Sequence, residues 1–279
     1  MPQFLSFLPE IWSWLILITA QVAALARRSA LSVALLAVFA SVSLVIGLIS
    51  PLAMAMIGFG LLGARCLPRL SGWAAGVGHV ALILWCLALG AHLVPGFNNL
   101  QILDQVQAGA RSADFTMFLN VDKPMIFFAV LLAWPGMLNN TRATSFPTLI
   151  PGLAILPLLF AVGLGAGAIR LEVGLPPWWL VFALSNLFMT CLAEEAFFRG
   201  YLQSAITSRV GAAAGIVAAS LLFGLAHFSG GFALVVFASI LGLGCGLGYF
   251  ATGRLWVSVA MHFSFNFLHL ALFTYPGPV

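Results

Sequence analysis

The sequence predicts an all-α protein, a polytopic transmembrane bundle with about eight to ten spans. Hydrophobic residues make up 62% of the 279 residues and charged residues only 6%, against about 45–50% and about 25% in soluble domains. Eleven basic and seven acidic residues are too few to cover a water-exposed surface of this size. A lipid-embedded backbone must pair its own polar groups, so helices are the expected spanning structure.

Apolar runs recur along the whole chain, and an arrangement with about ten spans is favoured. A helix needs about 20 apolar residues to cross the hydrocarbon core. The runs at 51–64 and 124–138 are shorter, so we expect them to be tilted, half-buried or extended by flanking residues. The runs lie at 11–26, 30–49, 51–64, 72–94, 124–138, 147–168, 177–206, 210–228, 231–251 and 255–273.

The first run is expected to be a retained anchor, with both termini outside. Residues 1–10 contain no Lys or Arg, whereas Arg27 and Arg28 follow the run, which is the reverse of a secretory signal. With about ten spans, most basic residues then fall in inner loops, as the positive-inside rule requires. These residues are Arg27, Arg28, Arg65, Arg69, Arg142, Arg199, Arg209 and Arg254. The net charge of +4 is scattered, so no nucleic-acid partner is expected.

One continuous membrane domain is expected, in two parts. Residues 1–176 form N-terminal transmembrane helices with a polar loop at about 95–123, which is long enough to be either functional or flexible. Residues 177–279 form a catalytic helical core, in which the glycines at 242–248 indicate a close helix contact. The cysteines form no CxxC pair and are expected to be buried small hydrophobes: Cys66, Cys86, Cys191 and Cys245.

Two adjacent acids, Glu194 and Glu195, interrupt the apolar run at 177–206, and Arg199 follows the second by four residues. An ionisable group at membrane depth costs roughly 2.5–3.5 kcal/mol on insertion scales. Glu195 and Arg199 are spaced to pair on one helix face, and Glu194, rotated by about 100°, is left to face another group. Burial favours the neutral form of an unpaired carboxyl, which suits a general base. A structural ion pair with a spare acid is the simpler alternative.

Histidines follow in two later apolar runs. His227 comes four residues after Phe223, and His262 shares a helix stripe with Asn266, which His269 continues. Taken alone, each is equally well explained as a structural residue or as an interhelical hydrogen-bond partner. Two further histidines have no such partner in the sequence and are expected to be structural: His79 and His92.

Together, a carboxylate, two imidazoles and an amide in an apolar bundle suit the addition of water to a carbonyl. A base removes a proton from water, and polarised N–H groups hold the developing oxyanion. The chain has no GxSxG nucleophile elbow and no evident Cys–His dyad. Hydrolysis by an activated water is therefore favoured over a covalent intermediate.

Helix geometry raises one difficulty for this grouping. If turns lay near Ser208 and Gly253, a rise of about 1.5 Å per residue would place Glu194, His227 and His262 about 21, 28 and 14 Å from the cytoplasmic ends of their helices. Either the helices tilt strongly or the chain turns earlier. Of the two, an earlier turn, around Gly200 to Gln203, is expected.

The motifs Glu-Glu-xxx-Arg at 194–199, Phe-xxx-His at 223–227 and His-xxx-Asn at 262–266 occur in this order. They resemble the three signature motifs of the CPBP family, also called Abi. This family comprises type II CAAX prenyl endopeptidases, bacterial intramembrane proteases and bacteriocin-immunity-type proteins. The run Glu-Glu-Ala-Phe-Phe-Arg-Gly-Tyr-Leu-Gln is similar to the family's first motif, and the resemblance covers about residues 177–273.

The resemblance implies a set of roles, with two residues supporting the catalytic ones. The catalytic residues would be Glu194, His227, His262 and Asn266, supported by Glu195 and Arg199. Glu194 and His227 would activate water, while His262 and Asn266 would stabilise the oxyanion. Family members have been described both as metalloproteases and as glutamic-type proteases. The chain has no HExxH, so no cofactor is favoured, but zinc held by Glu194, His227 and His262 stays open.

The leading prediction is an intramembrane endopeptidase that cleaves near the membrane, in the C-terminal tail of a lipidated or membrane-anchored protein. Prenylated CAAX tails, sorting tails and immunity-related peptides all fit as substrates, with the lipid bilayer as surroundings and a bacterial inner (plasma) membrane as location. The runner-up is an ion- or proton-coupled transporter that uses the buried Glu and His groups, although 11–168 contains no half matching 177–273. A family member that only binds a peptide is a third reading.

Overall fold

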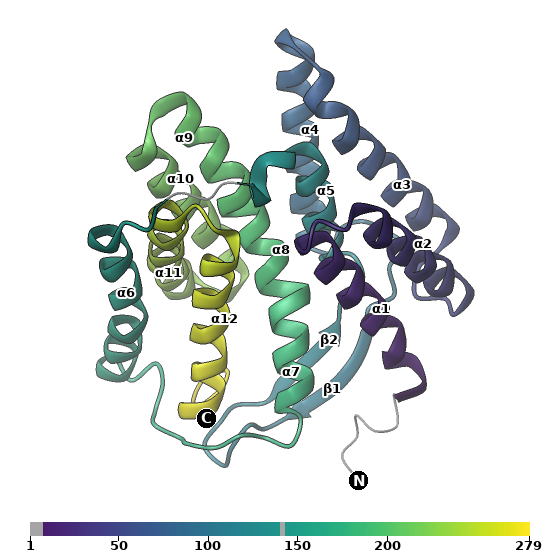
Figure 1. Ribbon diagram of the computed structural model, residues 1–279. Coiled ribbons are helices and arrows are strands. Elements are labelled where there is room, and N and C mark those ends of the chain that lie inside the picture. The colour runs from purple at the N-terminus through teal and green to yellow at the C-terminus, as the bar shows by residue number, and fades with distance from the viewer. Residues whose placement is uncertain (1–7, 140–142) are drawn as a thin grey trace. The chain divides into compact units, whose positions relative to one another are not determined.

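The computed structural model describes residues 8–139 and 143–279, which are mainly helical (Figure 1). In this part of the chain, six helices are long and apolar enough to cross a membrane, which confirms the predicted polytopic helical class. They are Pro51–Arg69, Gly72–Gly90, Phe146–Gly165, Trp179–Val210, Phe232–Thr252 and Leu255–Leu272, with shorter apolar helices at Ile11–Leu25, Ser29–Val45 and Ala212–Leu225. Residues 1–7 and Arg142, on which part of the topology prediction rests, lie outside the described residues.

The chain divides into two compact units that interleave in sequence. The first unit holds the chain up to Gln105, together with Thr116–Pro135 and Leu180–Ala193. The second unit holds Val106–Phe115, Gly136–Trp179 and Glu194–Val279. All the predicted site residues belong to the second unit.

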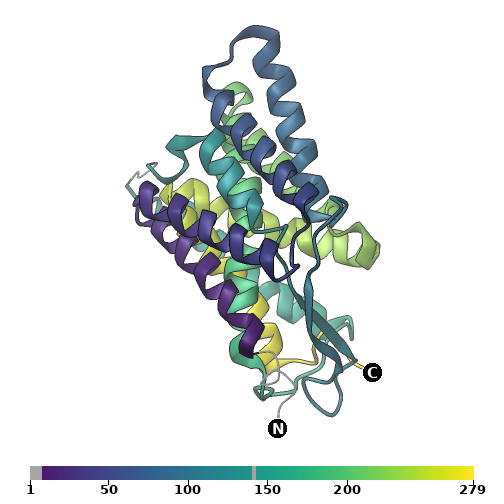
Figure 2. The same cartoon turned by 90° about the vertical axis from the view of Figure 1, so that its right-hand side faces the viewer.

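The first unit is built mainly from helices near the N-terminus. Its helices are α1 (Leu8–Leu25), α2 (Ser29–Val45), α3 (Pro51–Cys66), the 3-10 turn η2 (Leu67–Arg69), α4 (Gly72–Gly90) and α5 (Met125–Ala133). Helix α1 packs against α2, and α3 packs against both α4 and α5. Helices α3 and α4 form a hairpin that is visible in both Figure 1 and Figure 2. Ser50 begins α3, because its hydroxyl accepts a hydrogen bond of 3.1 Å from the Ala53 amide.

The apolar run at 124–138 does not form a span of its own. Helix α5 covers only the nine residues Met125–Ala133, about 14 Å at 1.5 Å per residue. Pro135 follows and starts a 3-10 turn, because a proline disfavours helical backbone in the residue before it. Most of the α5 side chains are buried within the protein, which accounts for the apolar composition of this run.

The polar stretch at about 95–123 contains a β-hairpin that the sequence analysis did not predict. Strand β1 (Leu100–Val106) pairs with β2 (Phe115–Leu119) in a two-stranded sheet. Ile102 and Leu103 of β1, and Met117 and Leu119 of β2, are buried. An isolated hairpin is marginally stable in water, so this burial is what holds the segment in an ordered form.

His92, which was predicted to be structural, has a partner that is distant in the sequence. Its Nδ1 lies 2.7 Å from Oδ2 of the buried Asp122. Asn99 donates to the other carboxylate oxygen at 3.2 Å, and its own carbonyl accepts from the Val121 amide. These contacts tie the end of α4 to both ends of the hairpin. This cluster could not be predicted from the sequence because His92 and Asp122 are 30 residues apart.

The cysteine prediction is correct for three residues and wrong for one. Cys86, Cys191 and Cys245 are buried, whereas Cys66 is exposed. Cys66 is the last residue of α3.

The second unit is organised around one central helix, α11. Its elements are α6 (Phe146–Gly165), the π-helical segment η5 (Ala196–Gln203), α9 (Ser204–Val210), α10 (Ala212–Leu225), η6 (Phe228–Gly230), α11 (Phe232–Thr252) and α12 (Leu255–Leu272). Helix α11 packs against α10, α6 and α12. A buried cluster joins three of these helices, formed by Leu156, Leu159, Leu241, Cys245 and Met261.

Alternate glycines let α11 approach neighbours on two opposite faces. A Cβ on Gly242 would lie 3.1 Å from Nη2 of Arg199, and one on Gly246 would lie 2.9 Å from Oε1 of Gln203. On the other face, a Cβ on Gly244 would lie 3.0 Å from a backbone oxygen of α6. Residues two apart on a helix point about 200° apart. The alternate glycines at 242, 244, 246 and 248 therefore allow close packing on two opposite faces of α11. The predicted close helix contact at 242–248 is confirmed.

The expected early turn at Gly200 to Gln203 is wrong. The chain stays helical through Trp179–Val210 and turns at Gly211, whose φ of 95° suits glycine. The turn lies 17 residues after Glu194 and 16 residues before His227. Glu194 and His227 therefore reach similar depths without an earlier turn, whereas His262 lies only nine residues after the next turn, at Gly253.

Candidate active site

The two acids lie on a short α-helical segment between two π-helical ones. Helix α7 (Trp179–Ser185) leads into the π-helical η4 (Asn186–Cys191), and α8 (Leu192–Glu195) separates η4 from η5. A π-helix is rare and frequently marks a functional site, because its wider turn changes the direction of side chains. Here the two wide turns flank Glu194 and Glu195 directly.

Glu195 and Arg199 form the predicted ion pair. Nη1 of Arg199 donates to Oε1 of Glu195 at 3.1 Å, and both side chains are fully buried. Nη2 of the same guanidinium donates to the carbonyl of Gly242 at 3.0 Å. The Arg199 side chain thus attaches η5 to the glycine face of α11. Four residues further along both helical segments, Nε2 of Gln203 donates to the carbonyl of Gly246 at 3.0 Å.

His262 on α12 lies beside both acids. Its Nδ1 is 2.9 Å from Oε1 of Glu195, and its Nε2 is 3.9 Å from Oε2 of Glu194. A carboxylate only accepts, so Nδ1 carries the hydrogen when Glu195 is ionised. In the neutral imidazole Nε2 is then an acceptor, and it can donate only when His262 is protonated. Any role of His262 as an oxyanion donor therefore requires the imidazolium form.

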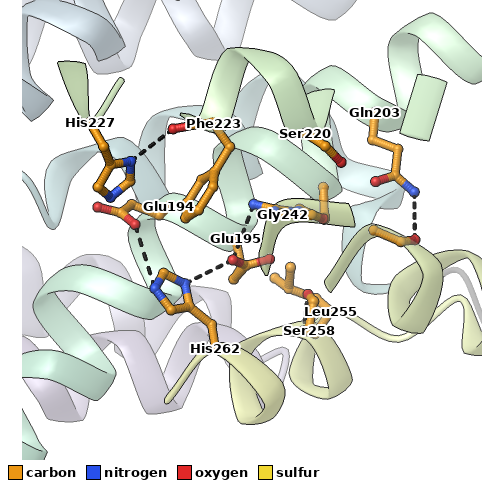
Figure 3. Close-up of polar contacts among 12 residues, drawn as sticks. Glu194, Glu195, Gln203, Ser220, Phe223, His227, Gly242, Leu255, Ser258 and His262 are labelled. Carbon is orange, nitrogen blue, oxygen red and sulfur yellow. Dashed lines mark hydrogen bonds and ion pairs between the residues drawn. The ribbon is translucent and has the colours of Figure 1, made fainter. Parts of the chain in front are cut away.

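His227 lies just past the end of α10. Its Nδ1 donates to the carbonyl of Phe223 at 2.8 Å, because a carbonyl can only accept. The neutral ring therefore presents Nε2 as an acceptor. Figure 3 shows the Glu194 carboxyl pointing toward the space between the imidazoles of His227 and His262. Glu194 keeps 12% of its side chain exposed, unlike the fully buried Glu195.

Phe223, which was named in the second motif but given no role, is a central residue of the site. Its ring centroid lies 4.8 Å from that of His227 and 5.4 Å from that of His262. The guanidinium carbon of Arg199 lies 4.5 Å from the same centroid, within the range of a cation–π contact. One buried ring therefore contacts three polar side chains from three helical segments. Its position four residues before His227 was the available signal.

Asn266 and His269 occupy different surroundings on α12. Asn266 is partly buried one turn beyond His262, which places both on the same side of the helix. Nε2 of His269 instead lies 3.2 Å from the carbonyl of Thr274, and its ring contacts Phe160 and Tyr275. His269 therefore belongs to the C-terminal packing and not to the polar centre.

The donor set was tested for its fit to zinc. His227 and His262 each have Nδ1 engaged by an oxygen acceptor and Nε2 available, an arrangement found around metal-bound histidines. Across residues 8–139 and 143–279, however, no three His, Cys, Asp or Glu side chains are grouped to hold a metal ion. Glu194, His227 and His262 have the right ligand types, but they are not placed at ligand distances.

The fold and this centre define a helical membrane protein with a buried carboxylate–imidazole site. Residues 176–268 match the family model of type II CAAX prenyl endopeptidase Rce1-like proteins, consistent with a CPBP-family protease. The match covers the three motifs and confirms the predicted resemblance. It supports the intramembrane protease class for a chain whose described residues include six helices apolar enough to span a membrane. Searches of curated proteins and of solved structures found no match to the chain.

Proposed function

We propose that this protein is an intramembrane endopeptidase that hydrolyses a peptide bond near the membrane surface. Its substrate would be the C-terminal tail of a lipidated or membrane-anchored protein, in the inner (plasma) membrane of a bacterium. The observation that carries the proposal is the contrast between two adjacent acids. Glu195 is buried and paired with Arg199, whereas Glu194 is partly exposed beside His262. The family match over 176–268 supports the same reaction class.

In the proposed reaction, Glu194 and His227 activate one water. The Glu194 carboxylate takes one proton from the water, while Nε2 of His227 accepts a hydrogen bond from the O–H that remains. The water oxygen bonds to the scissile carbonyl carbon, and the carbonyl oxygen gains negative charge. The side-chain amide of Asn266, together with protonated His262, would donate to this oxyanion. The C–N bond then breaks, and the proton held by Glu194 passes to the leaving amine.

Glu195 and Arg199 would hold the site without taking part in proton transfer. Glu195 orients His262 through Nδ1, and Arg199 compensates the buried carboxylate. A carboxylate at Nδ1 fixes the orientation of the imidazole ring, as in other carboxylate–histidine pairs. This division gives each of the two adjacent glutamates its own task.

Zinc is the alternative way to activate the same water. Glu194, His227 and His262 would be its ligands, and the metal would supply Lewis-acid polarisation. We favour the metal-free route because Glu194 and His227 already offer two proton acceptors toward one space. A chelator that leaves cleavage unchanged would support this choice, and loss of activity restored by zinc would overturn it.

The test is cleavage of probe peptides by the full chain in proteoliposomes, read by mass spectrometry. The probes are a farnesylated peptide ending in a CAAX sequence and an unmodified C-terminal sorting-type tail. Glu194→Gln and His227→Gln should each lower the rate by about 10²–10⁴-fold, the usual contribution of general acid–base catalysis. Glu172→Gln, outside the motifs, is the matched control and should retain activity.

Two results would contradict the proposal. One is full cleavage by both site variants, and the other is no cleavage of either probe by the unmodified chain. Ion flux that is lost in Glu194→Gln without any peptide cleavage would favour the transporter hypothesis. Reaction in ¹⁸O-labelled water should place the label in the new carboxylate, as direct attack by water requires.

A further inference from the structure

An apolar groove lies between α3 and α4 in the first unit. Its volume is about 540 Å³, within the size range of small-molecule sites. Every lining residue is apolar or small, including Gly60, Gly63, Cys66, Gly78 and Trp85. Gly63 leaves room that a larger residue would fill, because a Cβ there would meet no atom within 4 Å, whereas Gly60 and Gly78 let Trp85 and Leu67 approach closely.

The groove lies between helices that are both apolar enough to cross a membrane. Water does not stably fill an apolar space in hydrocarbon surroundings, so the fitting occupant is hydrocarbon. On α3 and η2 the lining extends from Met56 to Leu70, a length of about 21 Å at 1.5 Å per residue. This length suits an extended alkyl chain better than a compact ligand.

Two exposed arginines lie at one end of the groove. Arg65 is flanked by the lining residues Ala64 and Cys66, and Arg69 precedes the lining residue Leu70. Neither guanidinium makes a hydrogen bond or an ion pair with any residue that the structure describes. The sequence also has no acid between Glu10 and Asp104. The positive charge at this end of the groove is therefore uncompensated by the neighbouring chain.

We propose that the α3–α4 groove binds one anionic phospholipid. An acyl chain lies between the two helices, and the phosphate is held by Arg65 and Arg69, whose guanidinium groups match phosphate geometry. Arginines that serve topology alone attract the anionic surface diffusely. The groove adds a shaped hydrocarbon site beside the charge, so it selects a single retained lipid. This site is independent of the proposed peptidase activity.

The experiment is native mass spectrometry of the full chain in detergent, with phosphatidylglycerol and phosphatidylcholine of identical acyl chains. The unmodified chain should retain phosphatidylglycerol preferentially. Arg65→Gln with Arg69→Gln should reduce this preference by roughly 30-fold, since each basic residue near an anionic surface contributes about a fivefold factor. The control is Arg28→Gln with Arg254→Gln, which removes the same charge from two other exposed positions and should change the preference less than about threefold.

A second pair of variants tests the hydrocarbon part on the same helix. Gly63→Leu should fill the groove and reduce retention of both lipids, whereas Gly58→Leu, also in open space but outside the groove, should not. Equal retention of the two lipids by the unmodified chain would overturn the proposal. So would an unchanged preference in the Arg65/Arg69 variant, whose exposed positions do not disturb the core. Retention is measured without any substrate, so its failure leaves the peptidase proposal standing.

Discussion

Removing the Arg199 guanidinium tests how the polar centre of the second unit is stabilised. In Arg199→Met, the Glu195 carboxylate loses its ion-pair partner while its side chain stays fully buried. Breaking a buried ion pair from one side typically costs 3–5 kcal/mol. Here Nε of Arg199 and Oε2 of Glu195 have no hydrogen-bond partner even in the intact pair. The native pair is therefore incompletely compensated, and we expect the lower end, about 3 kcal/mol, or about 100-fold in the unfolding equilibrium.

The assay is a double-mutant cycle on the detergent-solubilised chain, unfolded with SDS and followed by tryptophan fluorescence. Glu195→Gln keeps an acceptor for His262 and removes the charge. The double variant should cost less than the sum of the single ones by about 2 kcal/mol, because it leaves no uncompensated buried charge. Additive costs for Glu195→Gln and Arg199→Met would refute the reasoning, since they would mean that the pair is not electrostatically coupled.

Three further predictions concern other parts of the chain. The hydrogen bond from the Ser112 hydroxyl, followed by Arg111, lowers the pKa of Glu172. The contact is therefore fully stabilising above the ordinary carboxyl pKa and is lost as the pH falls through the lowered value. The hydrogen-exchange protection factor of the Ala113 amide, which corrects for the slower intrinsic exchange at low pH, should therefore fall on acidification, and less so in Ser112→Ala. Gly246→Ala places a Cβ 2.9 Å from Gln203 and should destabilise the chain by about 1–3 kcal/mol, unlike Gly58→Ala. A chelator should leave the unfolding midpoint unchanged.

Much of the polar centre could be predicted because its members are close in sequence. The Glu195–Arg199 pair follows from spacing on one helix, and the order of the three motifs predicted which helices hold the site. The contact between Glu195 and His262 spans 67 residues and depends on how α12 packs. No local sequence pattern predicts a contact between residues so far apart in the chain, so only the structure shows this contact.

The parts that the sequence did not predict share one physical cause, which is that apolar composition does not distinguish burial in lipid from burial in protein. The α5 run is as apolar as a span, yet its side chains are buried in the chain itself. Conversely, the hairpin at 100–119 looked like a loop because polar residues surround a few buried ones. Local hydropathy indicates that a side chain is buried away from water, but it does not indicate whether that side chain is buried in lipid or in the protein.

The regular geometry of the short helix α8 explains why two adjacent acids can have separate surroundings. On a regular helix, neighbouring side chains point about 100° apart, so a residue turned toward α11 leaves the one before it on another face. Glu195 points to Arg199 and His262, inside the protein, with no exposed surface. Glu194 is turned away from that pair and keeps an exposed edge. A proton acceptor that must meet both water and substrate needs such an edge, whereas an orienting acid needs complete burial. The two adjacent glutamates therefore provide an accessible carboxyl, Glu194, beside a buried one that is paired with Arg199. Substituting Glu195 should change the orientation of the His262 ring without removing Glu194, the group that we propose as the base.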